Sequence, residues 1–215
     1  MVVAHPFRRP SRRAVLAAAV ALFVTAAAPP ARAAVDEDAA TALIRDYQNA
    51  LLSVMKRAES VDAAGRVDAL DAPIRATFDF ARMARAAAGK AWRAAEPDTR
   101  ERMVEAFAAY SVAMHADRFD GYSGESFHID GTTPGPAGSL LVNTHIARPS
   151  KDDVPISYVV SPGDDGPRVV DVLLEGSISE VALRRSEWSA IGRRDGLPGL
   201  IEALDALTAR LLKGS

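Results

Sequence analysis

The stretch that decides the fold is Arg168-Val-Val-Asp-Val-Leu-Leu-Glu-Gly-Ser-Ile-Ser-Glu-Val-Ala-Leu-Arg-Arg-Ser-Glu-Trp188. Residues 168–174 are rich in β-branched and aliphatic side chains, which is typical of a buried strand. Gly176 ends this strand, and a helical pattern begins near Ser177. The stretch therefore predicts a sheet that is completed just before a final set of helices.

Upstream of the sheet, residues 36–118 have the three- and four-residue apolar spacing of amphipathic helices. The first helix is expected over residues 36–60. The second is expected over residues 64–71, because Ala72-Pro73 favours an interruption at that point.

Two further helices are marked by the residues at their ends. Asp79 has the position of an N-cap and Gly89 that of a helix end, which predicts a short helix between them. Pro97 suits the first turn of a longer helix that ends near Asp117. The apolar face of this longer helix is formed by Met103, Phe107, Tyr110 and Met114.

Past Gly121 the apolar spacing changes to a period of two, as in strands. Four strands are expected, over residues 125–130, 139–148, 155–161 and 168–174. Their connections are short and rich in Gly, Pro and Asp, which favours antiparallel pairing.

After the strands the chain returns to helix over residues 179–194 and, following a break at residues 196–199, over residues 200–212. The predicted fold class is therefore α+β. It has three parts, a helical part over about 36–118, a sheet part over about 121–176 and C-terminal helices over about 177–213.

The composition fits one folded domain, since the 215 residues are 48% apolar. The chain has no cysteine, which excludes disulfides, thiol catalysis and cysteine-ligated zinc. Much of the apolar share is alanine, which fills space poorly. Composition alone therefore leaves open whether the core is solid or holds a cavity.

The N-terminus has the pattern of an export signal over residues 1–33. Four arginines precede an apolar run over residues 14–28, and Ala31-Arg-Ala33 has the small-x-small pattern of a cleavage site. Ser11-Arg-Arg-Ala-Val-Leu16 resembles a twin-arginine signal, so Sec and twin-arginine export both stay open. A retained N-terminal anchor is the alternative to cleavage.

The part of the chain after this signal is acidic. Residues 34–215 hold 21 basic and 28 acidic residues, a formal charge of −7, because five of the 26 basic residues lie in the signal. Such a domain is a poor candidate for binding nucleic acid or an anionic membrane surface.

Few side chains have the arrangement of a reactive site. His128 and Asp130 share one face of an expected strand, with His145 on the neighbouring strand, and they are the best metal candidates. We favour a structural or exposed role for them. Asp171 interrupts an apolar strand, where an unpaired carboxylate is costly. We favour a structural role, held by an arginine or a backbone donor, over a general base in a pocket.

Several motifs occur in a characteristic order. These motifs are Asp171-Val172, Glu175-Gly-Ser-Ile-Ser179, Arg185-Ser-Glu-Trp188, Gly196-Leu-Pro-Gly-Leu200 and, earlier, Phe78-Asp-Phe80 and Met83-Ala-Arg85. Together they resemble the MlaC and toluene-tolerance family of periplasmic lipid carriers. The particular residues at these motifs favour its hopanoid-associated HpnM branch. The family usually has a tryptophan where Pro167 stands, so the contact of that indole is lost here.

The resemblance implies a single lipid-binding domain over residues 34–215. Its curved four-stranded antiparallel sheet, of the nuclear-transport-factor type, would enclose an apolar pocket. The implied function is a monomeric periplasmic carrier, without a chemical step, cofactor or metal, for a phospholipid or hopanoid. The implied partners are an inner-membrane ABC transport complex and an outer-membrane acceptor. The expected pocket lining is Met103, Phe107, Tyr110, Met114, Tyr158, Val160, Val170, Val172 and Leu174.

Two other functions stay open at this point. One is a small pocket enzyme of isomerase or dehydratase type on the same fold, with Asp171, Tyr158 or His128 as acid or base. The other is a structural module of the cell envelope, which would have a solid core in place of a pocket.

Overall fold

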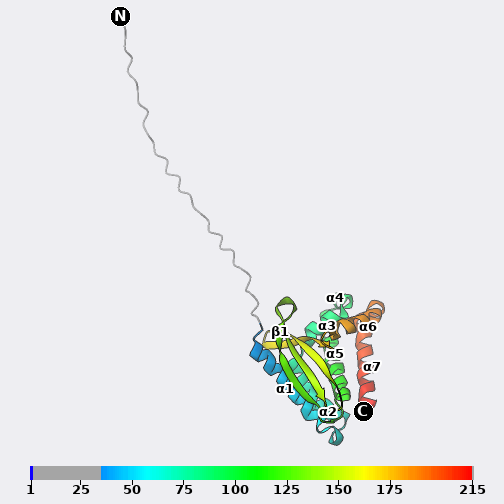
Figure 1. The fold of residues 1–215 in the computed structure, drawn as a ribbon. Coiled ribbons are helices and arrows are strands. Elements are labelled where there is room, and N and C mark those ends of the chain that lie inside the picture. The colour runs from blue at the N-terminus through cyan, green and yellow to red at the C-terminus, as the bar shows by residue number, and fades with distance from the viewer. Residues whose placement is uncertain (2–34, 215) are drawn as a thin grey trace. The chain divides into compact units, whose positions relative to one another are not determined.

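The first helix follows the predicted apolar spacing but ends at Met55, ahead of the predicted end near residue 60 (Figure 1). The structure is a computed structural model that describes Met1 and residues 35–214, so nearly all of the predicted export signal lies outside the described residues. Helix α1, Glu37–Met55, begins at the N-cap Asp36, whose side chain accepts a hydrogen bond from the Ala39 amide at 2.7 Å. A short 3₁₀ turn, Ala58–Ser60, follows it.

Helix α2, Ala63–Thr77, corrects the predicted interruption because it continues through Pro73. A proline inside a helix removes one backbone hydrogen bond and strains the preceding turn. The apolar face overrides this cost, since Leu70 and Ile74 on either side of Pro73 are both fully buried. The Thr77 hydroxyl also donates to the Pro73 carbonyl at 2.8 Å, which supports the last turn.

The next helix has the two ends that the sequence predicts. Helix α3, Phe80–Ala88, begins at Asp79, whose carboxylate accepts from the Arg82 amide at 2.9 Å. It ends at Gly89, which has a φ of 56°, a left-handed value that favours glycine. Two more helices follow, α4 over Lys90–Ala94 and α5 over Pro97–Arg118.

The sheet has five strands where the sequence analysis expects four. They are β1 (Ser126–Pro134), β2 (Leu140–Arg148), β3 (Lys151–Gly163), β4 (Gly166–Leu174) and β5 (Ile178–Ser179). They pair antiparallel in the order β1-β2-β3-β4-β5. The extra strand β5 has only two residues, too few to show a period of two. Glu175 and Gly176 both have positive φ and form the tight turn that folds β5 back onto β4.

A β-bulge between β3 and β4 changes which residues of β4 face inward. Val159 pairs with Asp171 and Val160 pairs with Val169, so Val170 is the extra residue between them. Val169 is fully buried, while beyond the bulge Val172 is the inward residue opposite Tyr158. The alternation of side chains is therefore not continuous along this strand.

The first of the final helices lies where the sequence predicts it, and the second begins earlier than expected. Helix α6, Glu180–Arg194, has Ser179 as its N-cap, and α7, Gly196–Gly214, follows after the single residue Asp195. The predicted break at residues 196–199 is instead the first turn of α7. Pro198 is tolerated there because the amides of a first helical turn have no partner within the helix.

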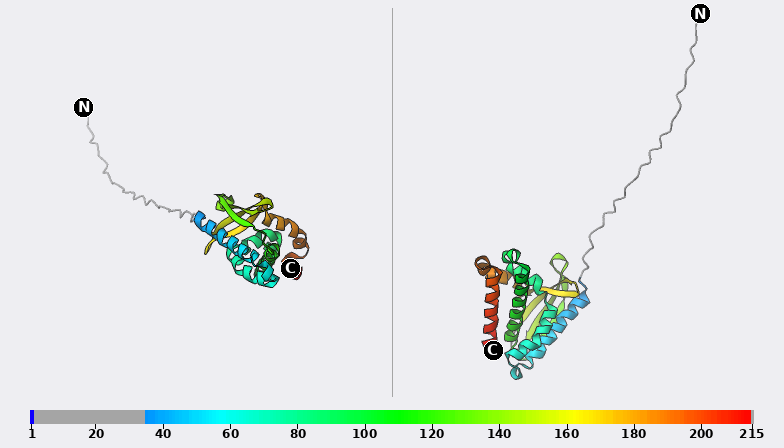
Figure 2. Two further views of the ribbon diagram at one scale, coloured as in Figure 1. Left: turned by 60° about the horizontal axis from the view of Figure 1, so that its bottom comes forward. Right: turned by 180° about the vertical axis from the view of Figure 1, so that it is seen from behind.

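The helices gather on one face of the curved sheet. Helices α1, α2, α3 and α5 lie on that face, and α7 packs along the side of α5 away from the sheet (Figures 1 and 2). The segment before α3 also joins the sheet, because the Asp79 amide donates to the Val169 carbonyl at 2.8 Å. Among residues 35–214, none of the helices combines the length and the apolar character that a membrane crossing requires.

Candidate ligand cavity

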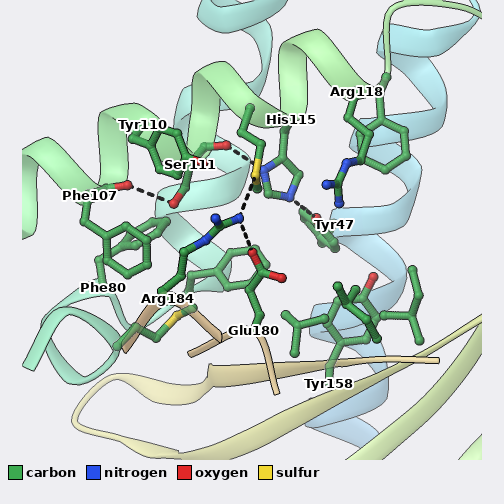
Figure 3. Close-up of a pocket in the computed structure, with 17 residues that line it drawn as sticks. Tyr47, Phe80, Phe107, Tyr110, Ser111, His115, Arg118, Tyr158, Glu180 and Arg184 are labelled. Carbon is green, nitrogen blue, oxygen red and sulfur yellow. Dashed lines mark hydrogen bonds and ion pairs between the residues drawn. The ribbon is translucent and has the colours of Figure 1, made fainter. Parts of the chain in front are cut away.

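An apolar cavity lies between α5 and the inner face of the sheet, with α1, α3 and α6 closing its sides (Figure 3). The residues that line it are Tyr47, Phe78, Phe80, Met83, Phe107, Tyr110, Ser111, Met114, His115, Arg118, Phe119, Ile156, Tyr158, Val172, Leu174, Glu180 and Arg184. The cavity volume is about 80 Å³. It lies within a wider hollow of about 730 Å³ that includes space open to solvent. The enclosed space can hold several waters but is small for a ligand site.

One end of the cavity is closed by aromatic rings in edge-to-face contact. The Phe107 ring lies 5.7 Å from that of Phe80 and 5.2 Å from that of Trp188. The Phe78 ring lies 5.8 Å from that of Phe80 and 5.3 Å from that of Tyr47. Such contacts hold the rings in defined positions, so this end is a rigid apolar wall.

A short chain of hydrogen bonds crosses the wall that α1 and α5 share. The Tyr47 hydroxyl lies 2.7 Å from His115 Nε2, and His115 Nδ1 lies 2.6 Å from the Ser111 carbonyl. Since a carbonyl can only accept, Nδ1 carries the proton and Tyr47 donates to Nε2. This places a neutral imidazole beside the cavity.

Burial lowers the pKa of His115 to about 4, the hydrogen bond to the Ser111 carbonyl opposes this shift, and the charge of Arg118 adds to it. Because the folded-state pKa lies below the ordinary 6.5, protons bind the unfolded state more tightly. The stabilisation is complete above pH 6.5 and is lost as the pH falls toward 4.

We therefore expect the free energy of unfolding to fall by about 2 kcal/mol between pH 6.5 and pH 5 through this residue. Urea denaturation at several pH values measures it. In His115→Gln this part of the pH dependence should disappear, because the side chain no longer titrates. An unchanged slope in the variant would show that other groups cause the loss.

The wall formed by α6 carries a compensated charge. The Arg184 guanidinium lies 2.6 Å from a carboxylate oxygen of Glu180 and 2.8 Å from one of Glu187. Its side chain is only 15% exposed and lies over the Tyr110 ring, 5.6 Å from the ring centre. The ion pair is therefore part of the packed wall, and Figure 3 shows Arg184 and Glu180 reaching into the cavity. The Arg184 guanidinium also lies 3.7 Å from the sulfur of Met114.

Arg118 marks the opening of the cavity. It is the exposed member of the lining, and its neighbours Met114, Phe119 and Leu174 are half-buried. Within residues 35–214 no carboxylate forms an ion pair with its guanidinium. The rim therefore offers a positive charge to a ligand whose apolar part lies inside.

The structure brings six of the nine predicted lining residues together at the cavity. They are Phe107, Tyr110, Met114, Tyr158, Val172 and Leu174. Met103 and Val160 are fully buried in the surrounding core, and Val170 is the bulge residue of β4, so these three lie outside the lining. A ligand-binding role for the six stays a prediction.

The sequence analysis missed the lining residues from other elements and the polar end of α5. His115 and Arg118 continue the helical spacing of Phe107 and Ser111, so this signal was present in the sequence. No local pattern could have placed Tyr47, Phe78 and the α6 ion pair at the same site, because their meeting depends on the tertiary fold.

The candidate metal residues lie outside the cavity lining. His128 and His145 are paired across β1 and β2 with their rings stacked 4.9 Å apart, and His145 Nδ1 lies 2.9 Å from Asp130. Among the described residues no group of three or more potential ligands has the arrangement of a metal site. The observed contacts are a hydrogen bond and a ring stack between neighbouring strands at the surface.

Asp171 joins the end of the sheet to the start of α6. Its Oδ1 accepts from the amides of Val172 at 2.8 Å and Val181 at 3.1 Å, and its Oδ2 accepts from the Ser179 hydroxyl at 2.5 Å. Backbone donors thus hold the carboxylate, as the structural interpretation expects. The residue does not line the cavity.

Comparison with known proteins identifies the family. The sequence model of the MlaC protein family matches residues 45–206, most of the chain. The chain belongs to the MlaC family. A search of curated proteins finds no match for this MlaC-family chain.

A solved structure has the same fold as this MlaC-family chain. It is described as a phospholipid-binding protein from Ralstonia solanacearum in complex with a phospholipid. It shares 17% identity with a TM-score of 0.69, and the match covers 83% of this chain and 99% of that one. The α+β class with a curved antiparallel sheet is thereby confirmed, with five strands in place of four.

Proposed function

We propose that this chain is a lipid carrier that holds the acyl chains of a phospholipid in the cavity between α5 and the sheet. The observation that carries the proposal is the cavity itself, which is lined mainly by aromatic and aliphatic side chains on the inner face of an MlaC-family fold. The similar fold of a phospholipid-binding protein supports it.

The physical need for such a cavity follows from the cost of moving a lipid through water. An acyl chain has about 15 methylenes, and exposing each to water costs about 0.8 kcal/mol. The cost is therefore roughly 12 kcal/mol per chain. A protein that covers these chains removes most of this cost, and it needs no reactive group to do so. We propose that the chain carries out no chemical step.

The cavity must widen when a lipid enters, because its volume is only about 80 Å³. Helix α5 faces the sheet across the cavity through side chains, and none of the backbone hydrogen bonds between elements of the described part joins the two. Separation of α5 from the sheet therefore breaks side-chain contacts without breaking strand pairing.

We further propose that the chain works in the periplasm as the soluble component of an ABC-type transport system. It would exchange lipid between an inner-membrane complex and an outer-membrane acceptor. A hopanoid as ligand, and with it the HpnM branch, stays part of this proposal. The rival enzyme is less well supported, because Asp171 is held by three donors and His128 does not line the cavity. Of its three candidate acid or base residues, Tyr158 alone lines the cavity.

Lipid extraction tests the proposal. Protein purified from a bacterial envelope is extracted with organic solvent and analysed by mass spectrometry, and the stripped protein is then offered labelled phospholipid in vesicles. We expect close to one lipid per chain in both measurements. Absence of co-purified lipid together with failure to take up labelled lipid would overturn the proposal.

Arg118 is expected to contact the phosphate of the head group at the rim. Because this residue is exposed and screened by solvent, Arg118→Glu should weaken phospholipid binding by only about three- to tenfold. A titration with labelled phosphatidylglycerol measures it. Arg45→Glu, an exposed change on α1 outside the cavity lining, is the matched control. Equal affinities in the two variants would place the head group elsewhere.

A further inference from the structure

A second hollow lies between α4 and α6, outside the ligand cavity. Its volume is about 790 Å³, and Ala91, Trp188 and Leu197 form part of its apolar floor. Gly89 and Arg185 also line a smaller hollow of about 280 Å³ beside it. We call the two hollows together the α4–α6 groove.

The rim of this groove is basic although the domain as a whole is acidic. Five exposed cations line it, Arg85, Lys90, Arg93, Arg185 and Arg193. None of the five forms an ion pair with a carboxylate in the part of the chain that the structure describes. A sixth cation, Arg82, is paired with Asp79 at 2.9 Å, and Glu96 is the carboxylate among the lining residues. The groove thus concentrates positive charge on a domain of formal charge −7 over residues 34–215.

The spacing of two of these cations suggests the shape of the partner. Arg185 and Arg193 are eight residues apart on α6 and both face the groove, so roughly 12 Å of helix separates them. This distance is about two helical turns. A helix lying in the groove would meet both arginines with carboxylates about seven or eight residues apart, while its apolar side covered the floor.

We infer that the α4–α6 groove is a docking site for an acidic amphipathic helix of a partner protein. A bilayer is flat on this scale, so its head groups could reach the cationic rim but would leave the concave apolar floor uncovered. A helix fills both. The inference goes beyond lipid binding, because the groove and the ligand cavity are lined by different residues.

The chain carries its own reporters for this site. Its two tryptophans, Trp92 and Trp188, both line the α4–α6 groove, so tryptophan emission responds to a ligand that enters it. The probe is a synthetic amphipathic peptide of about four helical turns, with glutamates on one face and alanine and leucine on the other. The same peptide with lysine in place of glutamate is the charge control.

We expect the acidic peptide, but not the lysine peptide, to change the tryptophan emission of the purified protein. The double variant Arg185→Glu, Arg193→Glu should weaken this binding at least about tenfold, and added salt should weaken it further. Arg45→Glu should bind as the parent does. Circular dichroism and labelled-lipid uptake of the double variant show that its fold and cavity are intact, which separates this test from that of lipid binding.

Three results would overturn the inference. Equal binding of the two peptides would show that charge does not select the partner. Unchanged binding by the double variant would place the peptide elsewhere. Binding of phosphatidylglycerol vesicles that depends on the same two arginines, without peptide binding, would identify the groove as a membrane contact.

Discussion

Val172→Trp is expected to abolish stable phospholipid binding while the domain stays folded. Val172 lies on β4 opposite Tyr158, is half-buried, and lines the cavity. An indole at this position would occupy the space of roughly five methylenes of an acyl chain. At about 0.8 kcal/mol each this is about 4 kcal/mol, or roughly 1,000-fold in affinity. Labelled-lipid uptake from vesicles measures the effect.

The neighbouring residue provides a matched control. Leu173 is on the same strand and is also half-buried, but it points to the opposite face, in register with Ser157 and Ser179. Leu173→Trp adds similar bulk outside the cavity, so we expect lipid uptake close to that of the parent. Equal loss in both variants would show that bulk on β4 disturbs the fold and that the cavity is not the cause.

Asp171→Ala is expected to cause the largest loss of stability among the changes considered. It leaves the amides of Val172 and Val181 and the hydroxyl of Ser179 without their acceptor. Bonds to an ionised carboxylate are stronger than neutral ones, although losses at one site do not add fully. We expect a cost of about 3 kcal/mol, which corresponds to a decrease in Tm of roughly 6–12 °C for a domain of this size.

Asp171→Asn separates the contribution of the hydrogen bonds to stability from that of the negative charge. The two amides both donate to Oδ1, which an asparagine carbonyl can replace, and its NH₂ group can donate to the Ser179 oxygen. We expect this variant to lose less than half as much stability in thermal or urea unfolding. A loss equal to that of Asp171→Ala would mean that the negative charge, and not the hydrogen-bond geometry, stabilises the junction.

The helix ends could be predicted because capping is local chemistry. Asp79 and Gly89 bound α3 as the sequence indicates, since a carboxylate cap and a left-handed glycine act on their own turn. Pro73 shows the limit of such signals. Its local preference against helix is outweighed by the burial of Leu70 and Ile74, which depends on distant parts of the chain.

The sheet was predicted in class but not in detail, for two physical reasons. Strand β5 is too short for a periodic pattern and is held by its hairpin turn. The bulge at Val170 shifts the alternation of β4, so a count of alternate residues places Val170 with Val172 when Val169 is the buried one. A bulge leaves no signal in the strand's composition.

About a third of the cavity lining, six of its seventeen residues, could be predicted in the same way. The face of α5 with Phe107, Tyr110 and Met114 follows from helical spacing, and these residues do meet the inner face of the sheet. Met103 lies on the same face but is covered by the core, because spacing identifies an apolar stripe without showing where a cavity replaces solid packing. Which part of the stripe faces space is decided by the elements opposite it.

The most direct test of the account maps where a bound lipid lies. A phospholipid with a photoreactive diazirine near the end of one acyl chain is loaded into the stripped protein, cross-linked by light and located by peptide mass spectrometry. We expect cross-links at cavity residues such as Phe107, Tyr110 and Val172, with none on the outer face at Leu173. Cross-links spread over the surface, or gathered in the α4–α6 groove with the cavity unlabelled, would contradict the account.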